Sequence, residues 1–162
     1  MLAASKIAPC LWFDSEAEHA VAFYTRIFKN SRVVTTSYYG EAGREVHGRP
    51  PGSVMAIGFE LERQSFTALN GGPLFRFNEA VSLQVNCASQ EEIDYYWNAL
   101  TVESDPAAQQ CGWLKDRFGL SWQVVPDDIA QTLSGPDAVR AGRAMVALMK
   151  MKKIDLAALR NA

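Results

Sequence analysis

Two stretches of this sequence follow one pattern, and the repetition limits the possible folds more than any other feature. Lys6–Asp14 (KIAPCLWFD) is apolar, and Ala80–Cys87 (AVSLQVNC) alternates apolar with polar residues, as strands do. Each stretch leads into a Ser-x-x-Glu spacing, which typically caps the start of a helix. The two capping boxes are Ser15 with Glu18 and Ser89 with Glu92. The chain is therefore predicted to contain two related strand–helix units.

The helices predicted after these boxes also match each other. Apolar side chains recur at helical spacing in both, and one constant offset places Phe23 and Tyr24 over Tyr96 and Trp97, and Ile27 over Leu100. The predicted buried faces are Ala17, Ala20, Val21, Tyr24, Ile27 and Phe28 in the first helix, and Ile93, Tyr96, Trp97 and Leu100 in the second.

Strands are predicted to follow each helix. The first half offers Arg32–Tyr39, Val54–Leu61 and Ser65–Asn70, with a Gly/Pro-rich loop over residues 40–52. The second half offers a hairpin over Cys111–Pro126 with a turn at residues 116–119, where Asp116 has a structural role. Only TVESDPAAQQ precedes that hairpin, so the matching strand is short or lost.

The domain prediction is a single α+β domain over residues 1–162. Its parts are a first βαβββ module (1–75), a shortened second module (76–126) and a helical tail (127–162). In the tail, one amphipathic helix follows Pro136 and another starts at Asp155. Met145 and Met149 are predicted to pack in the core.

Composition excludes several classes of partner. The net charge is −2 and no Lys/Arg run exceeds Lys152–Lys153, which argues against nucleic acid or an anionic membrane as partner. No window has the roughly 20 apolar residues of a membrane span. The three cysteines have no paired spacing and fit free thiols in a reducing compartment. We expect a cytoplasmic protein whose partners are small molecules or further copies of itself.

Several motifs in this order resemble the vicinal oxygen chelate superfamily, which includes glyoxalase I and the bleomycin resistance proteins. They are LWFD, FYTRIF, ALNGGP, EEIDYYWNAL and CGWLKDRFGLSWQVVP, which lie between residues 7 and 126, with MKMKKIDLAAL in the tail. Within the superfamily they are similar to the 3-demethylubiquinone methyltransferase-like branch. The resemblance implies that the two modules form an open, cavity-bearing barrel, and that the chain forms a homodimer.

The resemblance also implies where a metal ion would bind. The four ligand positions of metal-binding members fall on Ile7, Phe66, Ala80 and Gln123. Three of these cannot coordinate a metal, so we expect neither a metal site nor a metal cofactor. S-adenosylmethionine is not expected either, because Gly71–Gly72 leads to Pro73 rather than into a helix.

Strand alternation then predicts which residues line the cavity. Gln123 shares a face with Ser121 and Val125, while Trp122 and Val124 point toward the helix layer. On the same reasoning Phe66, Ala68 and Asn70 share the other ligand face. An apolar lining with a few amides and hydroxyls suits an uncharged or weakly polar small molecule. The predicted ligand-binding residues are Phe66, Asn70, Ser82, Gln84, Trp113 and Gln123.

Alternatives remain open at this point. Gln123, Gln84 and Ser82 could simply hydrogen-bond one another inside a filled barrel. An enzyme could use Gln123 with Glu60 or Glu79, or hold a metal weakly through Gln123 and loop residues. A purely structural subunit would fill the cavity with side chains such as Phe66 and Trp113. His19 and His47 are predicted at the surface, with the loop able to bring His47 over the cavity. Cys10 and Cys111 are predicted to be buried and inert.

Overall fold

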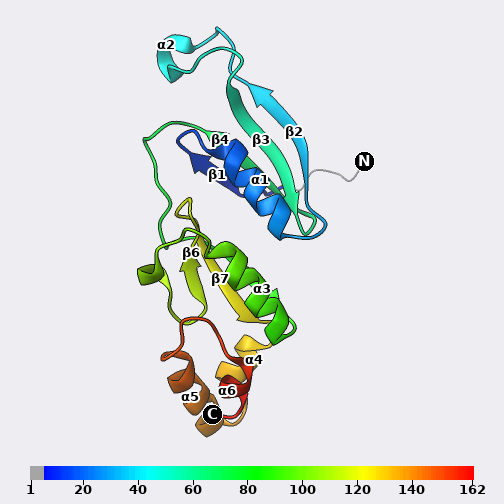
Figure 1. Cartoon of the computed structure of the whole chain (residues 1–162), viewed down its shortest axis with the longest axis vertical. Helices are drawn as coiled ribbons and strands as arrows, with labels where there is room; N and C mark the ends of the chain where they lie inside the picture. The colour runs from blue at the N-terminus through cyan, green and yellow to red at the C-terminus, as the bar shows by residue number, and fades with distance from the viewer. Residues whose placement is uncertain (1–5) are drawn as a thin grey trace. The chain divides into compact units, whose positions relative to one another are not determined.

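The computed structural model describes residues 6–162 and divides the chain into two compact units. The first unit ends at Phe77 and the second runs from Asn78 to Ala162. Figure 1 shows a sheet with a helix beside it in each unit, and further helices toward the C-terminus. Each unit is described by itself below.

The first unit contains one four-stranded sheet. Its elements are β1 (Cys10–Phe13), α1 (Ala17–Ile27), β2 (Arg32–Tyr38), α2 (Arg44–His47), β3 (Val54–Leu61) and β4 (Gln64–Asn70). The strand order is β1-β4-β3-β2, in which β1 pairs parallel with β4 and the other neighbours are antiparallel. The predicted strands are confirmed, and the loop over residues 40–52 contains the short helix α2.

The second unit repeats this plan with one strand fewer. Its elements are β5 (Ser82–Cys87), α3 (Gln90–Leu100), the 3₁₀ helix η1 (Pro106–Ala108), β6 (Trp113–Lys115), β7 (Ser121–Pro126), α4 (Ile129–Ser134), α5 (Ala138–Leu148) and α6 (Leu156–Arg160). The order is β5-β7-β6, in which β5 pairs parallel with β7, as β1 does with β4. The 3₁₀ helix stands where the first unit has β2, which confirms the predicted lost strand.

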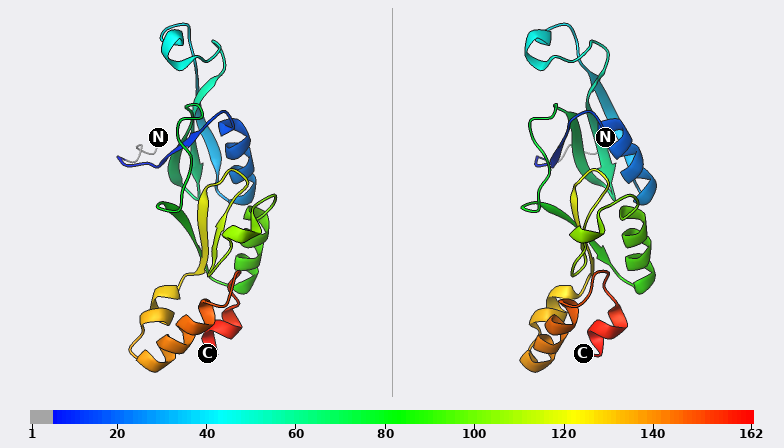
Figure 2. Two further views of the ribbon diagram at one scale, coloured as in Figure 1. Left: turned by 90° about the vertical axis from the view of Figure 1, so that its left-hand side faces the viewer. Right: turned by 60° about the vertical axis from the view of Figure 1, so that its left-hand side comes forward.

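Helices α1 and α3 each cover one face of their own sheet (Figures 1 and 2). Both have 11 residues, and their starts and ends differ by the same offset. The six residues predicted to form the apolar face of α1 are all buried. In α3, Ile93, Trp97 and Leu100 are buried and Tyr96 is half-buried. Apolar burial against the helix therefore stabilises each sheet on one side.

The two predicted capping boxes have different outcomes. In the second, Ser89 Oγ accepts the N–H of Glu92, and the Glu92 carboxylate accepts the N–H of Ala88 at 2.8 Å. The first prediction is wrong, because α1 begins after Glu16 without a side-chain cap from its own residues. Its first N–H group, that of Ala17, donates to Asn70 Oδ1 at 2.9 Å. The start of α1 is thus satisfied by a residue from the end of β4.

The C-terminal helices of the tail begin at aspartates. The side chain of Asp137 accepts the N–H groups of Val139 and Arg140, and that of Asp155 accepts the N–H of Ala158. The predicted core packing of Met145 and Met149 is wrong, because both are exposed and the buried side of α5 is formed by Ala141, Ala144 and Leu148. Smaller side chains let this helix approach its neighbours. None of the helices in residues 6–162 combines the length and apolar content of a membrane span.

Candidate functional site

The candidate site is the face of the second sheet opposite α3, which we call the polar face. Strand pairing arranges its side chains in two rows that cross the sheet. The first row is Ser82, Ser121 and Lys115, and the second is Gln84, Gln123 and Trp113. Leu83, Trp122 and Leu114 lie between the rows in sequence and point to the other face, because side chains alternate along a strand.

Gln123 lies at the centre of the second row and forms a hydrogen bond with the first. Its Nε2 donates to Ser82 Oγ at 2.9 Å. Gln84 Nε2 donates instead to Asn86 Oδ1 at 2.7 Å, within the same strand. The prediction that Gln123 shares a face with Ser121 and Val125 is confirmed by the strand register. The amide of Gln123 is therefore held in place, half-buried, by a neighbouring hydroxyl.

The first row contains an ammonium group that the sequence interpretation missed. Lys115 Nζ forms an ion pair with the carboxylate of Glu79, which lies just before β5. The hydrogen bond from Lys115 lowers the pKa of the Glu79 carboxyl, so this group is ionised. The available signal was the position of Lys115, which lies two residues after Trp113 on one strand and therefore shares its face.

The hairpin that carries Trp113 and Lys115 is held by Asp116, whose predicted structural role is confirmed. Its Oδ1 accepts the N–H groups of Phe118 and Leu120 at 2.8 and 3.1 Å. Its Oδ2 accepts the indole N–H of Trp122 at 2.8 Å. This buried carboxylate fixes the register between β6 and β7, and with it the rows of the polar face.

Two predicted site residues, Phe66 and Asn70, lie on the wrong face for this role. Both are buried with Ala68 on the side of β4 that α1 covers. The Asn70 amide donates to Glu18 Oε2 at 2.8 Å and to the carbonyl of Val54 at 3.0 Å. Phe66 stacks on Phe59, with ring centroids 5.4 Å apart. The face prediction for the first module is corrected accordingly, and neither residue belongs to the polar face.

Three of the four positions implied for a metal carry apolar side chains. Ile7 is 84% exposed and precedes β1, and Ala80 precedes β5. Phe66 faces α1, so only Gln123 lies on an open strand face with an oxygen that could coordinate. Residues 6–162 hold no group of three or more His, Cys, Asp or Glu side chains arranged around one point. Glu60, considered for an enzyme, pairs with Arg32 at 2.9 Å.

The residues present do not fit S-adenosylmethionine at the glycine pair either. A Cβ on Gly71 would come within 2.3 Å of the Trp12 ring, and Trp12 Nε1 donates to the carbonyl of Gly72 at 2.8 Å. The pair is therefore packed against an indole. No helix starts there with free N–H groups to bind a cofactor's carboxylate or ribose.

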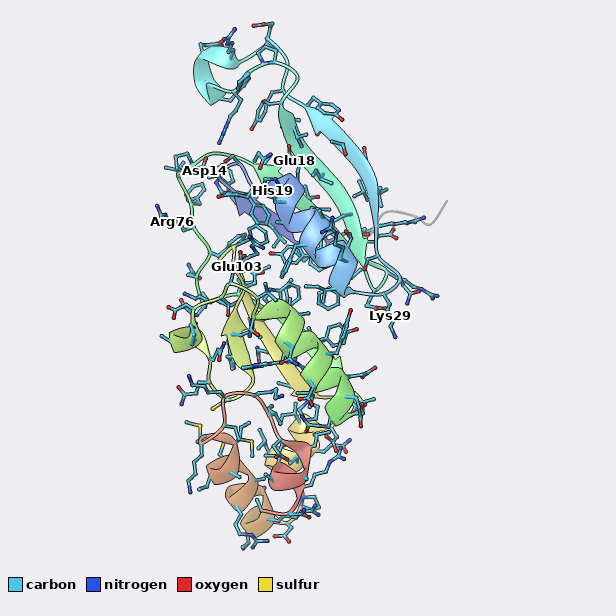
Figure 3. The ribbon with its side chains drawn as sticks, in the orientation of Figure 1. Asp14, Glu18, His19, Lys29, Arg76 and Glu103 are labelled. Carbon is cyan, nitrogen blue, oxygen red and sulfur yellow. The ribbon has the colours of Figure 1, made fainter. Side chains whose placement is uncertain are left out.

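The histidines and cysteines lie elsewhere. Figure 3 labels His19 on α1, where it is exposed as predicted. The His47 ring is half-buried in α2, packs on Tyr39 at 4.5 Å between centroids, and accepts the N–H of Arg49 at Nδ1. The predicted burial of Cys10 is wrong, because this residue is exposed, whereas Cys111 is half-buried and its Sγ lies 3.8 Å from Met149 Sδ. Burial raises the pKa of the Cys87 thiol to about 12.

Comparison with known proteins places this fold among relatives. The solved PhnB protein of Bacillus cereus is 33% identical with a TM-score of 0.62, covering 75% of this chain and 99% of that one. A protein of Pseudomonas aeruginosa is 19% identical with a TM-score of 0.57, covering 76% and 98%. The fosfomycin resistance protein FosX of Listeria monocytogenes is 15% identical with a TM-score of 0.51, covering 82% and 99%.

The last two likenesses concern the fold alone, which is the glyoxalase/bleomycin resistance fold. No match is found among the curated proteins. The family model described as 3-demethylubiquinone-9 3-methyltransferase matches residues 5–125, which include both sheets together with α1 and α3. The chain belongs to the 3-demethylubiquinone-9 3-methyltransferase family.

Proposed function

We propose that this chain binds a small molecule on its polar face without the help of a metal ion. The observation that carries the proposal is the second row, where the amide of Gln123 lies between the amide of Gln84 and the indole of Trp113. An aromatic surface supplies affinity, and nearby amides and hydroxyls fix orientation. The fold supports this, since members of the superfamily bind small molecules or act as enzymes.

An enzymatic reaction is the second candidate and has less support. The two carboxylates considered for it, Glu60 and Glu79, are each paired with a cation. The lowered pKa of Glu79 makes this group a weak base and a poor proton donor at neutral pH. The family name supplies a nominal methyl transfer, but the packing of Gly71 and Gly72 against Trp12 argues against a cofactor site there.

The proposal extends to the state of the protein in the cell. We propose a cytoplasmic homodimer, on the grounds of the unpaired cysteines and the family resemblance. A titration with S-adenosylmethionine is expected to give no heat signal. A saturable signal would contradict the absence of a cofactor site.

Native mass spectrometry of the freshly purified protein tests the central proposal. We expect a metal-free dimer that retains an organic ligand, with no mass gain when nickel or zinc is added. Gln123→Leu keeps the side-chain volume but removes the amide, and it should lose the ligand. The matched control is Gln64→Leu, at an exposed position in β4. A divalent ion bound at one per subunit would overturn the proposal and favour the enzyme.

A further inference from the structure

The first row of the polar face has hydrogen-bond donors without acceptors. Ser82 Oγ accepts from Gln123, so its own O–H still needs an acceptor. Ser121, beside it in the row, is 1% exposed, and its Oγ has no hydrogen-bond partner in residues 6–162. The two serines are register partners on adjacent strands, about 4.8 Å apart by strand geometry. An orphan hydroxyl at this position costs free energy unless something else satisfies it.

The third member of the row is a cation with a replaceable partner. The Lys115 side chain is 30% exposed, whereas that of its partner Glu79 is 66% exposed. An ammonium has three N–H donors, so one carboxylate oxygen does not exhaust it. The Glu79 carboxylate therefore shows where an anion pairs with Lys115. Because the Glu79 side chain is largely exposed, another anion can replace it at that position. The row as a whole carries two hydroxyls and an ammonium at one register level on three adjacent strands.

The second row lies one side-chain repeat away on the same face. Trp113 precedes Lys115 by two residues on β6, so the indole and the ammonium are about 7 Å apart along the strand. Trp113 is half-buried and pairs in register with Gln123. A planar group stacked on this ring would place a substituent at the first row.

From these two rows, and resting on the proposed function, we infer that the ligand is an aromatic or similarly planar carboxylate. Its carboxylate binds at Ser82, Ser121 and Lys115, and its planar body packs against Trp113. The carboxylate replaces Glu79 as the partner of Lys115 and gives Ser121 the acceptor it lacks. This inference differs from the expectation of an uncharged or weakly polar ligand, which left Lys115 out of the face.

The charge requirement can be tested with two probes of the same shape. 3-Phenylpropionate carries a carboxylate at about the row spacing from its ring, and 3-phenylpropionamide is its neutral counterpart. In amide-detected NMR titrations, we expect 3-phenylpropionate to shift the resonances of Ser82, Ser121 and the Trp113 indole. We expect it to bind about tenfold more tightly than the amide, as charge-assisted hydrogen bonds require. Equal affinities would overturn the inference.

Variants assign the effect to the row. Lys115→Met should weaken 3-phenylpropionate binding about tenfold. Lys153→Met is the matched control, because Lys153 pairs with Asp94 at 2.6 Å and is similarly exposed, and it should leave binding unchanged. Glu79→Gln removes the competing carboxylate and should tighten binding about threefold. Because Glu79 is largely exposed, this variant tests the inference even if Lys115→Met fails to fold.

Failure of this inference is distinguishable from failure of the proposed function. If the two probes shift the resonances of the polar face equally, small-molecule binding on this face is supported, but the inference that the ligand is a carboxylate is overturned. If neither probe shifts the polar face, the inference is overturned, and native mass spectrometry decides the proposed function independently. Weaker binding in Glu79→Gln would also overturn it, since Glu79 would then position Lys115 rather than compete with the ligand.

Discussion

At the residue scale, Asn70 shows how one polar side chain holds the first unit together. Its amide satisfies the N–H of Ala17, the carboxylate of Glu18 and the carbonyl of Val54. Figure 3 labels Glu18 at the start of α1. Asn70→Ala leaves these groups unpaired near the core, and we expect it to lower the free energy of unfolding by about 2–4 kcal/mol.

Urea unfolding followed by circular dichroism measures this loss. Asn98→Ala, at an exposed position in α3, is the control and should change stability by less than about 0.5 kcal/mol. Equal losses in the two variants would show that the Asn70 bonds do not stabilise the fold.

The Cys87 thiol gives a prediction for alkaline pH. Desolvation raises its pKa to about 12, and Glu92 and Asp127 add to the effect. In the unfolded chain the thiol ionises near its ordinary value of 9.0, so the folded state holds the proton more tightly. Stability from this group is fully present below pH 9 and is lost as the pH rises toward 12.

Unfolding of the wild type and of Cys87→Ala, measured across this pH range, tests the sign. The variant should be less stable at neutral pH but should lose less stability on going to high pH. A parallel pH dependence of the two proteins would contradict this role of Cys87.

Labelling with iodoacetamide should modify Cys10 and Cys111 before Cys87, because only Cys87 is fully buried.

At the element scale, the two helix starts provide a matched pair of substitutions. Ser89 caps α3 with its side chain, whereas α1 has no cap from its own residues. Ser89→Ala should therefore lower the free energy of unfolding by about 1 kcal/mol, and Ser15→Ala should leave it nearly unchanged. Thermal unfolding of both variants checks this. Equal losses would mean that Ser15 acts as a cap in solution.

Elements were more predictable from sequence than the direction of their side chains. The repeat, its lost strand and the helix faces follow from local spacing, so the sequence contains them. Local spacing does not show which face of β4 is covered by α1, because the mixture of Phe66, Ala68 and Asn70 is also typical of a cavity lining. Asn70 is buried on account of its bond to Ala17, a contact 53 residues away. Lys115 was missed for the opposite reason, since a lysine on a three-residue strand resembles an ordinary surface charge.

At the scale of the whole molecule, the segment between the two sheets lacks regular structure and exposes two large apolar side chains. Leu74 is 74% exposed and Phe75 is 58% exposed, in a stretch without strand or helix. We expect chymotrypsin to cut first at Leu74 or Phe75, releasing fragments that correspond to the two units. Mass spectrometry of a short digest identifies the cut. A first cut inside α3 or β7 would contradict the division at Phe77.

The missing strand of the second sheet bears on how this protein can aggregate. The edge strand β6 has three residues and carries Lys115, so it offers little backbone for another chain to extend. The edge strand β2 has seven residues and exposes Val33, Val34 and Tyr38, with two register shifts as its main irregularity. Fibril-like stacking under mild denaturation should therefore begin at the edge of the complete sheet, while the shortened sheet resists it.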